Sequence, residues 1–300
     1  MNTFTEKPKD VAEILRKVQR IQIVANRKVN NLLAGQYHSV FRGQGMEFDD
    51  VREYQPGDEV RSIDWNVTAR AGAPYVKRFR EERELTVLLL VDVSASGAFG
   101  TIERSKLELV TEVAALIMFS ALKNNDKAGL LLFCDEPVEY HAARKGKSNV
   151  LRLIRELLAV NPIQRPTNIT AALDYVNRVQ RRRAVVFLFS DFLGKLTESA
   201  LRMTSLRHDL IAAPVIDPRE QTMPNVGIAT FVDPETGEVV EVDTFHPGVR
   251  AAFDKANRMR IAAMKDRFQR LGIDQLPIFT GVDYVKDMHK FFRMRERRFR

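Results

Sequence analysis

Two stretches of the chain are apolar at nearly every position, and each ends in an aspartate. The first is 84–92, where Val and Leu predominate, and the second is 183–191. A strand that is buried on both faces of a sheet has no solvent-facing positions, so such continuous apolar runs are typical of central parallel strands. We therefore expect two inner strands, with Asp92 and Asp191 at their carboxyl ends.

Segments with helical periodicity alternate with shorter apolar runs over the rest of 84–300. The pattern predicts helices at 103–122, 149–158, 168–180, 197–207, 248–271 and 283–300. It predicts further strands at 128–133, 138–141, 210–215 and 276–280, and a hairpin of 227–232 with 239–242. Ser148 is the expected N-cap of the helix at 149. This alternation favours an α/β domain with a doubly wound, mostly parallel sheet.

The first 83 residues follow a different pattern. A basic amphipathic helix is expected at 11–33, and its apolar stripe favours docking on the body of the protein. Strand-like pieces at 47–54 and 75–79 are then separated by turn signals around the single tryptophan, Trp65. We expect two domains, with an N-terminal helix and small β-rich appendage in 1–83 and the α/β domain in 84–300.

Composition and charge exclude some classes of protein. A single cysteine, Cys134, excludes an internal disulfide framework and a cysteine-based zinc site, and its apolar surroundings favour a plain buried thiol. The chain has neither a signal-peptide core nor an apolar run of the roughly 18–20 residues that span a membrane, so we expect a cytoplasmic protein. The net charge of +8 makes nucleic acid or an acidic partner worth weighing.

Short oxygen-bearing side chains gather where the two inner strands end. Asp92, Ser94 and Ser96 follow the first strand at alternate positions, Asp191 ends the second, and Thr167 opens the helix between them. In doubly wound sheets, ligands bind beyond the carboxyl ends of the strands. Two carboxylates and three hydroxyls are hard ligands that suit Mg²⁺ or Mn²⁺. For any one of these residues the alternative is a helix cap or a turn.

This set of residues resembles the metal-ion-dependent adhesion site of von Willebrand factor A domains. Further motifs resemble a bacterial family, domain-of-unknown-function family fifty-eight (DUF58), and they cover nearly the whole chain. These motifs are Arg42-Gly-x-Gly-Met-Glu-Phe48, Arg52-Glu-Tyr-x-Pro-Gly-Asp58, Arg61-x-Ile-Asp-Trp65, Tyr75-Val-Lys-x-Phe79, and Arg207-His-Asp209 with Asp217-Pro218. Phe192 stands where many such domains have Gly, and Asn168 where Asp is common.

The resemblance implies a strand order of 3-2-1-4-5-6 and a role for each residue of the site. Asp92, Ser94 and Ser96 would bind the ion directly or through water, Thr167 would bind in some conformations only, and Asp191 would bind through water. The resemblance also implies a non-catalytic protein-binding module that is associated with MoxR-type AAA+ ATPases. Such a module would act in the assembly or maturation of client proteins, and its ion would capture an acidic side chain.

Partner contacts are also expected outside the metal site. Trp65 among arginines, with Arg42 and Arg61, is typical of an interface hot spot. The helix at 283–300 is expected to dock through its aromatic side chains and to face its basic side chains outward. The alternative function is a basic nucleic-acid-binding protein with a structural metal, although no nucleic-acid motif accompanies the charge. A metal-dependent hydrolase is less favoured, because no general base or nucleophile is evident.

Overall fold

The computed structural model describes residues 16, 18–21, 24, 45–82, 84–100, 105–233 and 235–298. These residues form two compact units. The smaller unit lies within Phe41–Leu85, and the larger unit combines the described residues of Met1–Val40 with those of Thr86–Arg300. The helix predicted at 11–33 lies mostly outside the described residues, although those described within it are helical.

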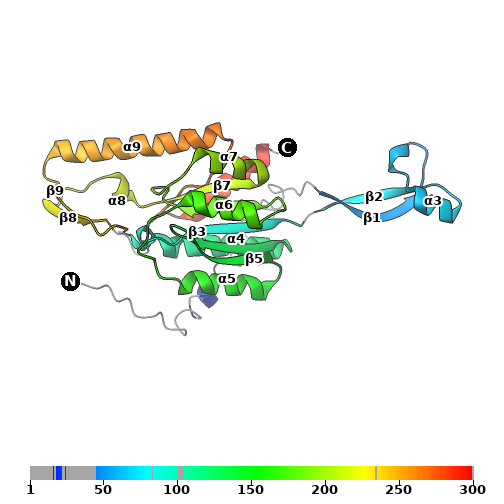
Figure 1. The fold of residues 1–300 in the computed structure, drawn as a ribbon, viewed down its shortest axis with the longest axis horizontal. Coiled ribbons are helices and arrows are strands. Elements are labelled where there is room, and N and C mark those ends of the chain that lie inside the picture. The colour runs from blue at the N-terminus through cyan, green and yellow to red at the C-terminus, as the bar shows by residue number, and fades with distance from the viewer. Residues whose placement is uncertain are drawn as a thin grey trace. The chain divides into compact units, whose positions relative to one another are not determined.

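The smaller unit is an antiparallel hairpin with a short helix between its strands. Strand β1 (Gly45–Glu53) pairs with β2 (Tyr75–Glu82), and the connection contains a 3-10 turn, η2 (Val60–Ser62), and helix α3 (Trp65–Ala71) (Figure 1). The two strands were predicted, but α3 was not.

Local capping explains why α3 forms in so short a segment. The Asp64 carboxylate accepts hydrogen bonds from the backbone amides of Asn66 and Val67, at 3.0 and 3.2 Å. Gly72 then ends the helix with a φ of 73°, a left-handed conformation that glycine adopts without strain. A capping residue at 64 and a glycine at 72 were the signals for this helix in the sequence.

An ion pair fixes the turn that follows β1. The Arg52 guanidinium donates to both carboxylate oxygens of Asp58, at 2.8 and 2.7 Å. Asp58 also accepts from the Gln55 amide at 2.9 Å. A bidentate arginine–carboxylate pair imposes a geometry as well as an attraction, so the turn at 55–58 is tied back to the strand.

The larger unit is built on a seven-stranded sheet. Its strands are β3 (Thr86–Asp92), β4 (Lys127–Phe133), β5 (Pro137–Arg144), β6 (Val185–Ser190), β7 (Asp209–Ile216), β10 (Asp274–Gln275) and β11 (Ile278–Phe279). Their order is β10-β7-β6-β3-β4-β5, with β11 also paired to β7, and only β5 is antiparallel to its neighbour. Numbered within this sheet from β3, the order is 3-2-1-4-5-6, as the family resemblance implied. The last predicted strand, at 276–280, is instead two short pieces that flank residues 276 and 277.

Helices cover both faces of the sheet. Helices α4 (Lys106–Lys123) and α5 (Lys147–Ala159) lie on one face, and α6 (Ile169–Val179) and α7 (Glu198–Arg207) on the other (Figure 1). Alternate residues of β3 divide between the two cores, and Leu88 and Leu90 pack on the α6 and α7 side. Both inner strands are therefore buried on both faces, as their apolar runs predicted.

The N-terminus of α5 corrects one prediction. The N-cap is Gly146, not Ser148, and its φ of 97° lies in a region that side-chain-bearing residues avoid. The chain needs glycine to leave β5 and enter the helix, so the helix begins before the serine.

The C-terminal part adds a second hairpin and two helices. These elements are α8 (Pro218–Gln221), β8 (Ile228–Val232), β9 (Val239–Asp243), α9 (Pro247–Arg270) and α10 (Tyr284–Arg298). The antiparallel pair β8–β9 confirms the predicted hairpin. Among the helices that the structure describes, none combines the length and the apolar character needed to cross a membrane.

Helix α10 docks through an apolar face, as expected, but one of its basic residues is inside. Val285, Met288, Phe291 and Phe292 are buried. Arg295 was expected to face outward, yet it is only 1% exposed. Its guanidinium pairs with Asp209 at 2.6 Å and with Asp274 at 3.3 Å, so two carboxylates at the edge of the sheet compensate its charge.

Candidate functional site

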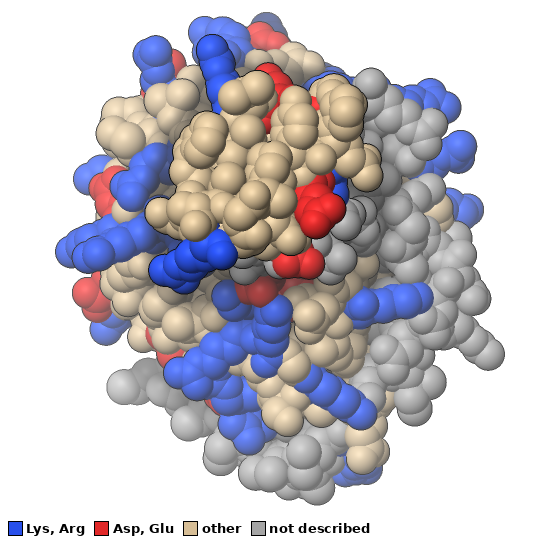
Figure 2. All heavy atoms as spheres, turned by 90° about the vertical axis from the view of Figure 1, so that its right-hand side faces the viewer, with Lys and Arg blue, Asp and Glu red and all other residues tan. Residues whose placement is uncertain are grey.

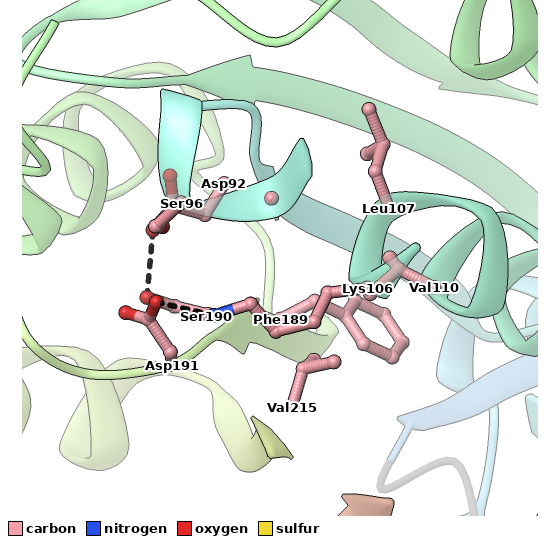
Figure 3. Close-up of a pocket in the computed structure, with 10 residues that line it drawn as sticks. Asp92, Ser96, Lys106, Leu107, Val110, Phe189, Ser190, Asp191 and Val215 are labelled. Carbon is pink, nitrogen blue, oxygen red and sulfur yellow. Dashed lines mark hydrogen bonds and ion pairs between the residues drawn. The ribbon is translucent and has the colours of Figure 1, made fainter. Parts of the chain in front are cut away.

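The structure brings the five predicted site residues together at one edge of the sheet. Strands β3 and β6 are parallel neighbours, so Asp92 and Asp191 emerge side by side at their carboxyl ends. Asp92, Ser94, Thr167 and Asp191 are all buried. A small pocket lies beside them and is lined in part by Asp92, Ser96 and Asp191 (Figure 3).

The loop after β3 turns its two serines toward each other. The Ser94 amide donates to the Asp92 carboxylate at 3.0 Å, which closes a turn directly after the strand. A 3-10 turn, η3 (Ala95–Ala98), follows and places the Ser96 hydroxyl 3.0 Å from that of Ser94. The alternate spacing in the sequence thus becomes one cluster of oxygens.

Thr167 joins this cluster from a second loop. Its Oγ1 lies 2.8 Å from Ser94 Oγ and 3.1 Å from Asp92 Oδ2. The Lys195 amide donates to the Thr167 carbonyl at 3.0 Å and holds the loop in place. Gly194 permits this close approach, because a Cβ at that position would overlap the Thr167 backbone.

The two departures from the family pattern have local explanations. Asn168 is the N-cap of α6, and its side chain accepts from the Ala171 amide at 3.2 Å, which an aspartate would also do. Phe192 has a φ of 58°, in the left-handed region that glycine adopts freely. Its ring packs edge-on against Phe268 of α9 at 5.1 Å, and this burial offsets backbone strain of about 1–2 kcal/mol.

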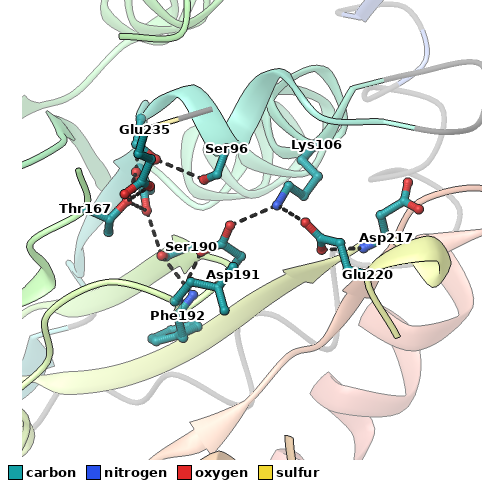
Figure 4. Close-up of polar contacts among 12 residues, drawn as sticks. Ser96, Lys106, Thr167, Ser190, Asp191, Phe192, Asp217, Glu220 and Glu235 are labelled. Atoms are coloured by element: carbon teal, nitrogen blue, oxygen red, sulfur yellow. Dashed lines mark hydrogen bonds and ion pairs between the residues drawn. The ribbon is translucent and has the colours of Figure 1, made fainter. Parts of the chain in front are cut away.

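Three further polar residues, which were not predicted, also lie at the site. Ser190 donates to Asp92 Oδ2 at 2.7 Å. The Lys106 ammonium donates to Asp191 at 2.9 Å and to Glu220 of α8 at 2.6 Å (Figure 4). Ser190 could have been found from its place directly before Asp191. Nothing local marks Lys106, which begins a helix, or Glu220, which lies 114 residues further along.

The two central carboxylates have different electrostatic surroundings. Burial, and then repulsion from Asp191, raises the pKa of Asp92 to about 6. Burial acts on Asp191 in the same direction, but the Lys106 ammonium more than offsets it, and the pKa of Asp191 is lowered. Asp191 therefore carries a compensated negative charge, whereas the charge on Asp92 is opposed by its surroundings.

The donor set fits a small hard cation. Ligands on adjacent vertices of an octahedron around Mg²⁺ lie about 3 Å apart, because each is about 2.1 Å from the ion. Thr167 Oγ1 lies 2.8 Å from Ser94 Oγ and 3.3 and 3.1 Å from the two Asp92 oxygens, separations that hydrogen bonds among these groups also give. In the described part of the chain, no three His, Cys, Asp or Glu side chains converge as a metal cluster. Binding of an ion here would therefore depend on the hydroxyls.

The predicted partner-binding residues lie in the smaller unit. Trp65 is 66% exposed at the start of α3, and Arg61 is also exposed. Arg42 lies outside the described residues. An exposed tryptophan is compatible with a docking surface, so the role of this pair stays a prediction.

The strand order and the polar site where β3 and β6 end define a doubly wound, mostly parallel α/β domain. The chain belongs to the family described as protein of unknown function DUF58, whose model matches residues 50–263. The uncharacterized protein Rv1480 of Mycobacterium tuberculosis is 31% identical over 291 residues, 96% of this chain and 92% of that protein. The uncharacterized protein YeaD of Bacillus subtilis is 30% identical over 161 residues, 52% of this chain and 36% of YeaD.

Solved structures of low sequence identity are also similar. BatB, a conserved hypothetical protein from Bacteroides thetaiotaomicron, matches with a TM-score of 0.46 and 15% identity, over 71% of this chain and 99% of BatB. The SpRpn10 VWA domain matches with a TM-score of 0.40 and 11% identity, over 68% of this chain and 93% of that domain.

Proposed function

We propose that this protein is a non-catalytic, metal-dependent protein-binding module that captures an acidic side chain of a partner. One observation carries the proposal: the buried cluster of hard oxygen ligands where β3 and β6 end. Asp92, Ser94, Ser96 and Thr167 would hold Mg²⁺ or Mn²⁺, and Asp191 would contribute through water. When bound, the ion would supply an electrophilic coordination position for a carboxylate.

The surrounding residues orient the Asp92 carboxylate and compensate part of the negative charge of this site. Ser190 and the Ser94 amide orient the Asp92 carboxylate through hydrogen bonds of 2.7 and 3.0 Å. Lys106 balances the charge of Asp191, so the site holds less net negative charge than its carboxylates alone would give. With mostly neutral hydroxyl ligands, an ion would keep much of its charge for an incoming anion.

We further propose that the partner is a MoxR-type AAA+ ATPase, with this protein as its adaptor in the assembly or maturation of client proteins. The resemblance of the sequence motifs implies this association, and the match of residues 50–263 to the DUF58 family model supports that resemblance. The exposed Trp65 and Arg61 offer a second contact surface, separate in sequence from the metal ligands.

The test combines cation titration with capture of partners. Asp92→Asn keeps the side-chain shape but removes the charge, and we expect it to weaken Mg²⁺ binding about tenfold or more by calorimetry. The wild-type protein should retain an ATPase from native extract with Mg²⁺ but not with EDTA, and Asp92→Asn should retain it in neither. Asp174→Asn on the exposed face of α6 is the matched control and should behave as wild type.

The nucleic-acid alternative predicts a different result. Helix α9 carries seven Lys or Arg and two Asp, and of its 24 residues only Phe268 is buried. Figure 2 draws Lys and Arg side chains in blue, with Asp and Glu in red among them. Nucleic acid retained equally by wild type and Asp92→Asn, with affinity that falls steeply with salt, would support this alternative over the adaptor.

A further inference from the structure

A fourth acidic residue reaches the site from the β8–β9 hairpin. The turn at its tip is shaped by Asp233, whose carboxylate accepts from the Glu235 amide at 2.8 Å. The Gly237 amide closes the turn on the Asp233 carbonyl, also at 2.8 Å. This turn points the Glu235 side chain at the loop that carries Thr167, and Glu235 Oε1 lies 3.2 Å from Thr167 Oγ1 (Figure 4).

The position of Glu235 is unusual for an acidic residue on a hairpin turn. Its side chain is partly buried, and the nearby charge of Asp191 repels it. Burial, and to a lesser degree this repulsion, raises the pKa of Glu235, although the Thr167 hydroxyl acts in the opposite direction. The Glu235 carboxylate therefore enters a site that already holds the carboxylates of Asp92, Asp191 and Glu220. It lies beside Thr167, a proposed ligand of the cation.

The hairpin that carries Glu235 has little other burial. Eight of the ten residues in β8 and β9 are exposed, and an isolated two-stranded hairpin is marginally stable in water. Its base is fixed, because Thr244 is fully buried and donates to the Gly227 carbonyl at 2.6 Å. A fixed base and an exposed body allow the tip to move away from the site while the rest of the domain stays in place.

We propose that Glu235 is an internal occupant of the Asp92 site, and that the β8–β9 hairpin is a latch that an acidic partner must displace. This inference rests on the proposed function, since it assigns Glu235 the place that the partner's carboxylate would take. A tethered carboxylate competes at high effective concentration, so the site would bind weakly to exposed acids in general. Only a partner with further contacts would then open it.

Two alanine variants in the same hairpin test the latch. Glu235→Ala removes the contact with Thr167, and Glu238→Ala removes an equal charge from an exposed position three residues away. The first measurement is hydrogen–deuterium exchange of the amides at 228–243. We expect exchange about tenfold faster in Glu235→Ala than in wild type, and no comparable change in Glu238→Ala.

The second measurement is competition, and its probe is a cyclic peptide that copies residues 232–239. With Mg²⁺ present, the peptide should bind Glu235→Ala at least tenfold more tightly than wild type or Glu238→Ala. A peptide with Gln in place of the glutamate that corresponds to Glu235 should lose this gain.

Unchanged exchange in Glu235→Ala would overturn the latch. Faster exchange with no gain in peptide binding would also overturn it, because the contact would then be structural and the site would not be occupied by Glu235. Failure of the proposed function would be seen separately, as Mg²⁺ titrations in which wild type and Asp92→Asn give the same result.

Discussion

Lys106 is the buried cation of the site, at 3% exposure, and its ammonium lies between Asp191 and Glu220. Removing one partner of a buried ion pair leaves charge without compensation, which destabilises a protein by about 3–5 kcal/mol. We expect Lys106→Met to lower the free energy of unfolding by about this amount in urea titrations without divalent cations. Lys255→Met, on the exposed face of α9, should change it by less than about 0.5 kcal/mol.

The effect of Mg²⁺ on the stability of Lys106→Met, compared with its effect on Asp92→Asn, tests for a cation at the site. If an ion binds beside Asp191, Mg²⁺ should restore part of the stability that Lys106→Met loses and should stabilise Asp92→Asn much less. Equal effects of Mg²⁺ on both variants would contradict a cation at this site.

His208 predicts a pH dependence of stability. Its imidazole is buried at the end of α7, and neither ring nitrogen has a hydrogen-bond partner among the described residues. Burial, and then the charges of Arg207 and Arg183, lowers the pKa of His208 to about 4. The unfolded chain, with a pKa near 6.5, therefore binds the proton more readily, and the contribution of His208 to stability falls as the pH falls from about 6.5 to about 4.

Between pH 7 and pH 5, the contribution of His208 to the free energy of unfolding falls by about 2 kcal/mol. Urea titrations at pH 7 and pH 5 give the change in the free energy of unfolding for each protein. This change should be less unfavourable for His208→Leu than for wild type, by about 2 kcal/mol. The same loss in both proteins would mean that His208 is not the group responsible.

Single residues also show where sequence reasoning reaches its limit at the site. Asp92, Ser94, Ser96, Thr167 and Asp191 were predictable because strand ends and helix starts mark them locally. Lys106, Glu220 and Glu235 were not, because the residues that they contact at the site lie 85, 114 and 68 positions away in the sequence.

At the scale of elements, α10 shows how a basic helix becomes part of the core. Arg295 pairs with Asp209 of β7 and Asp274 of β10, and its guanidinium lies 5.7 Å from the centre of the Phe291 ring. The helix thus joins two strands at one edge of the sheet. Asp209 belongs to the Arg207-His-Asp209 motif, so part of that motif is explained by packing.

Removing this arginine should loosen the edge of the sheet. We expect Arg295→Met to destabilise the protein by about 3–5 kcal/mol in urea titrations, because two carboxylates lose their buried partner. Arg297→Met on the exposed side of the same helix should have little effect. If both variants are equally stable, the buried ion pairs do not hold α10 in place.

The elements themselves were predictable to the extent that burial determined their pattern. β3 and β6 are buried on both faces, so their apolar runs were unambiguous. α3 is short and contains no buried residue, so it had no hydrophobic period to detect. The segment at 274–279 has only two residues in each strand, too few for any pattern.

At the scale of the whole molecule, the smaller unit begins and ends at adjacent positions. Gly45 of β1 pairs with Glu82 of β2 in an antiparallel register, which places these residues about 5 Å apart. A short linker can therefore replace everything between them without stretching the chain on either side.

We expect a variant with a Gly-Ser linker in place of 46–81 to keep a cooperative thermal unfolding transition and its Mg²⁺ affinity. It should lose capture of the ATPase if Trp65 and Arg61 form the docking surface. The point variant Trp65→Ala, which keeps the smaller unit, should lose capture as well and so shows that the loss is specific to this surface. Capture of the ATPase by both variants would contradict the predicted role of Trp65 and Arg61.

The β8–β9 hairpin also bears on how the protein avoids self-association. Both of its strands have a free edge in the described part of the chain, and Ile228, Phe231, Val232, Val239 and Val240 face solvent. Such segments tend to stack on copies of themselves, and interspersed charges prevent it. Five carboxylates between residues 233 and 243 give each copy a negative charge that repels the next. The acids that shape the latch would then also act as gatekeepers against aggregation, and neutralising them would turn an interaction element into a nucleus for fibre growth.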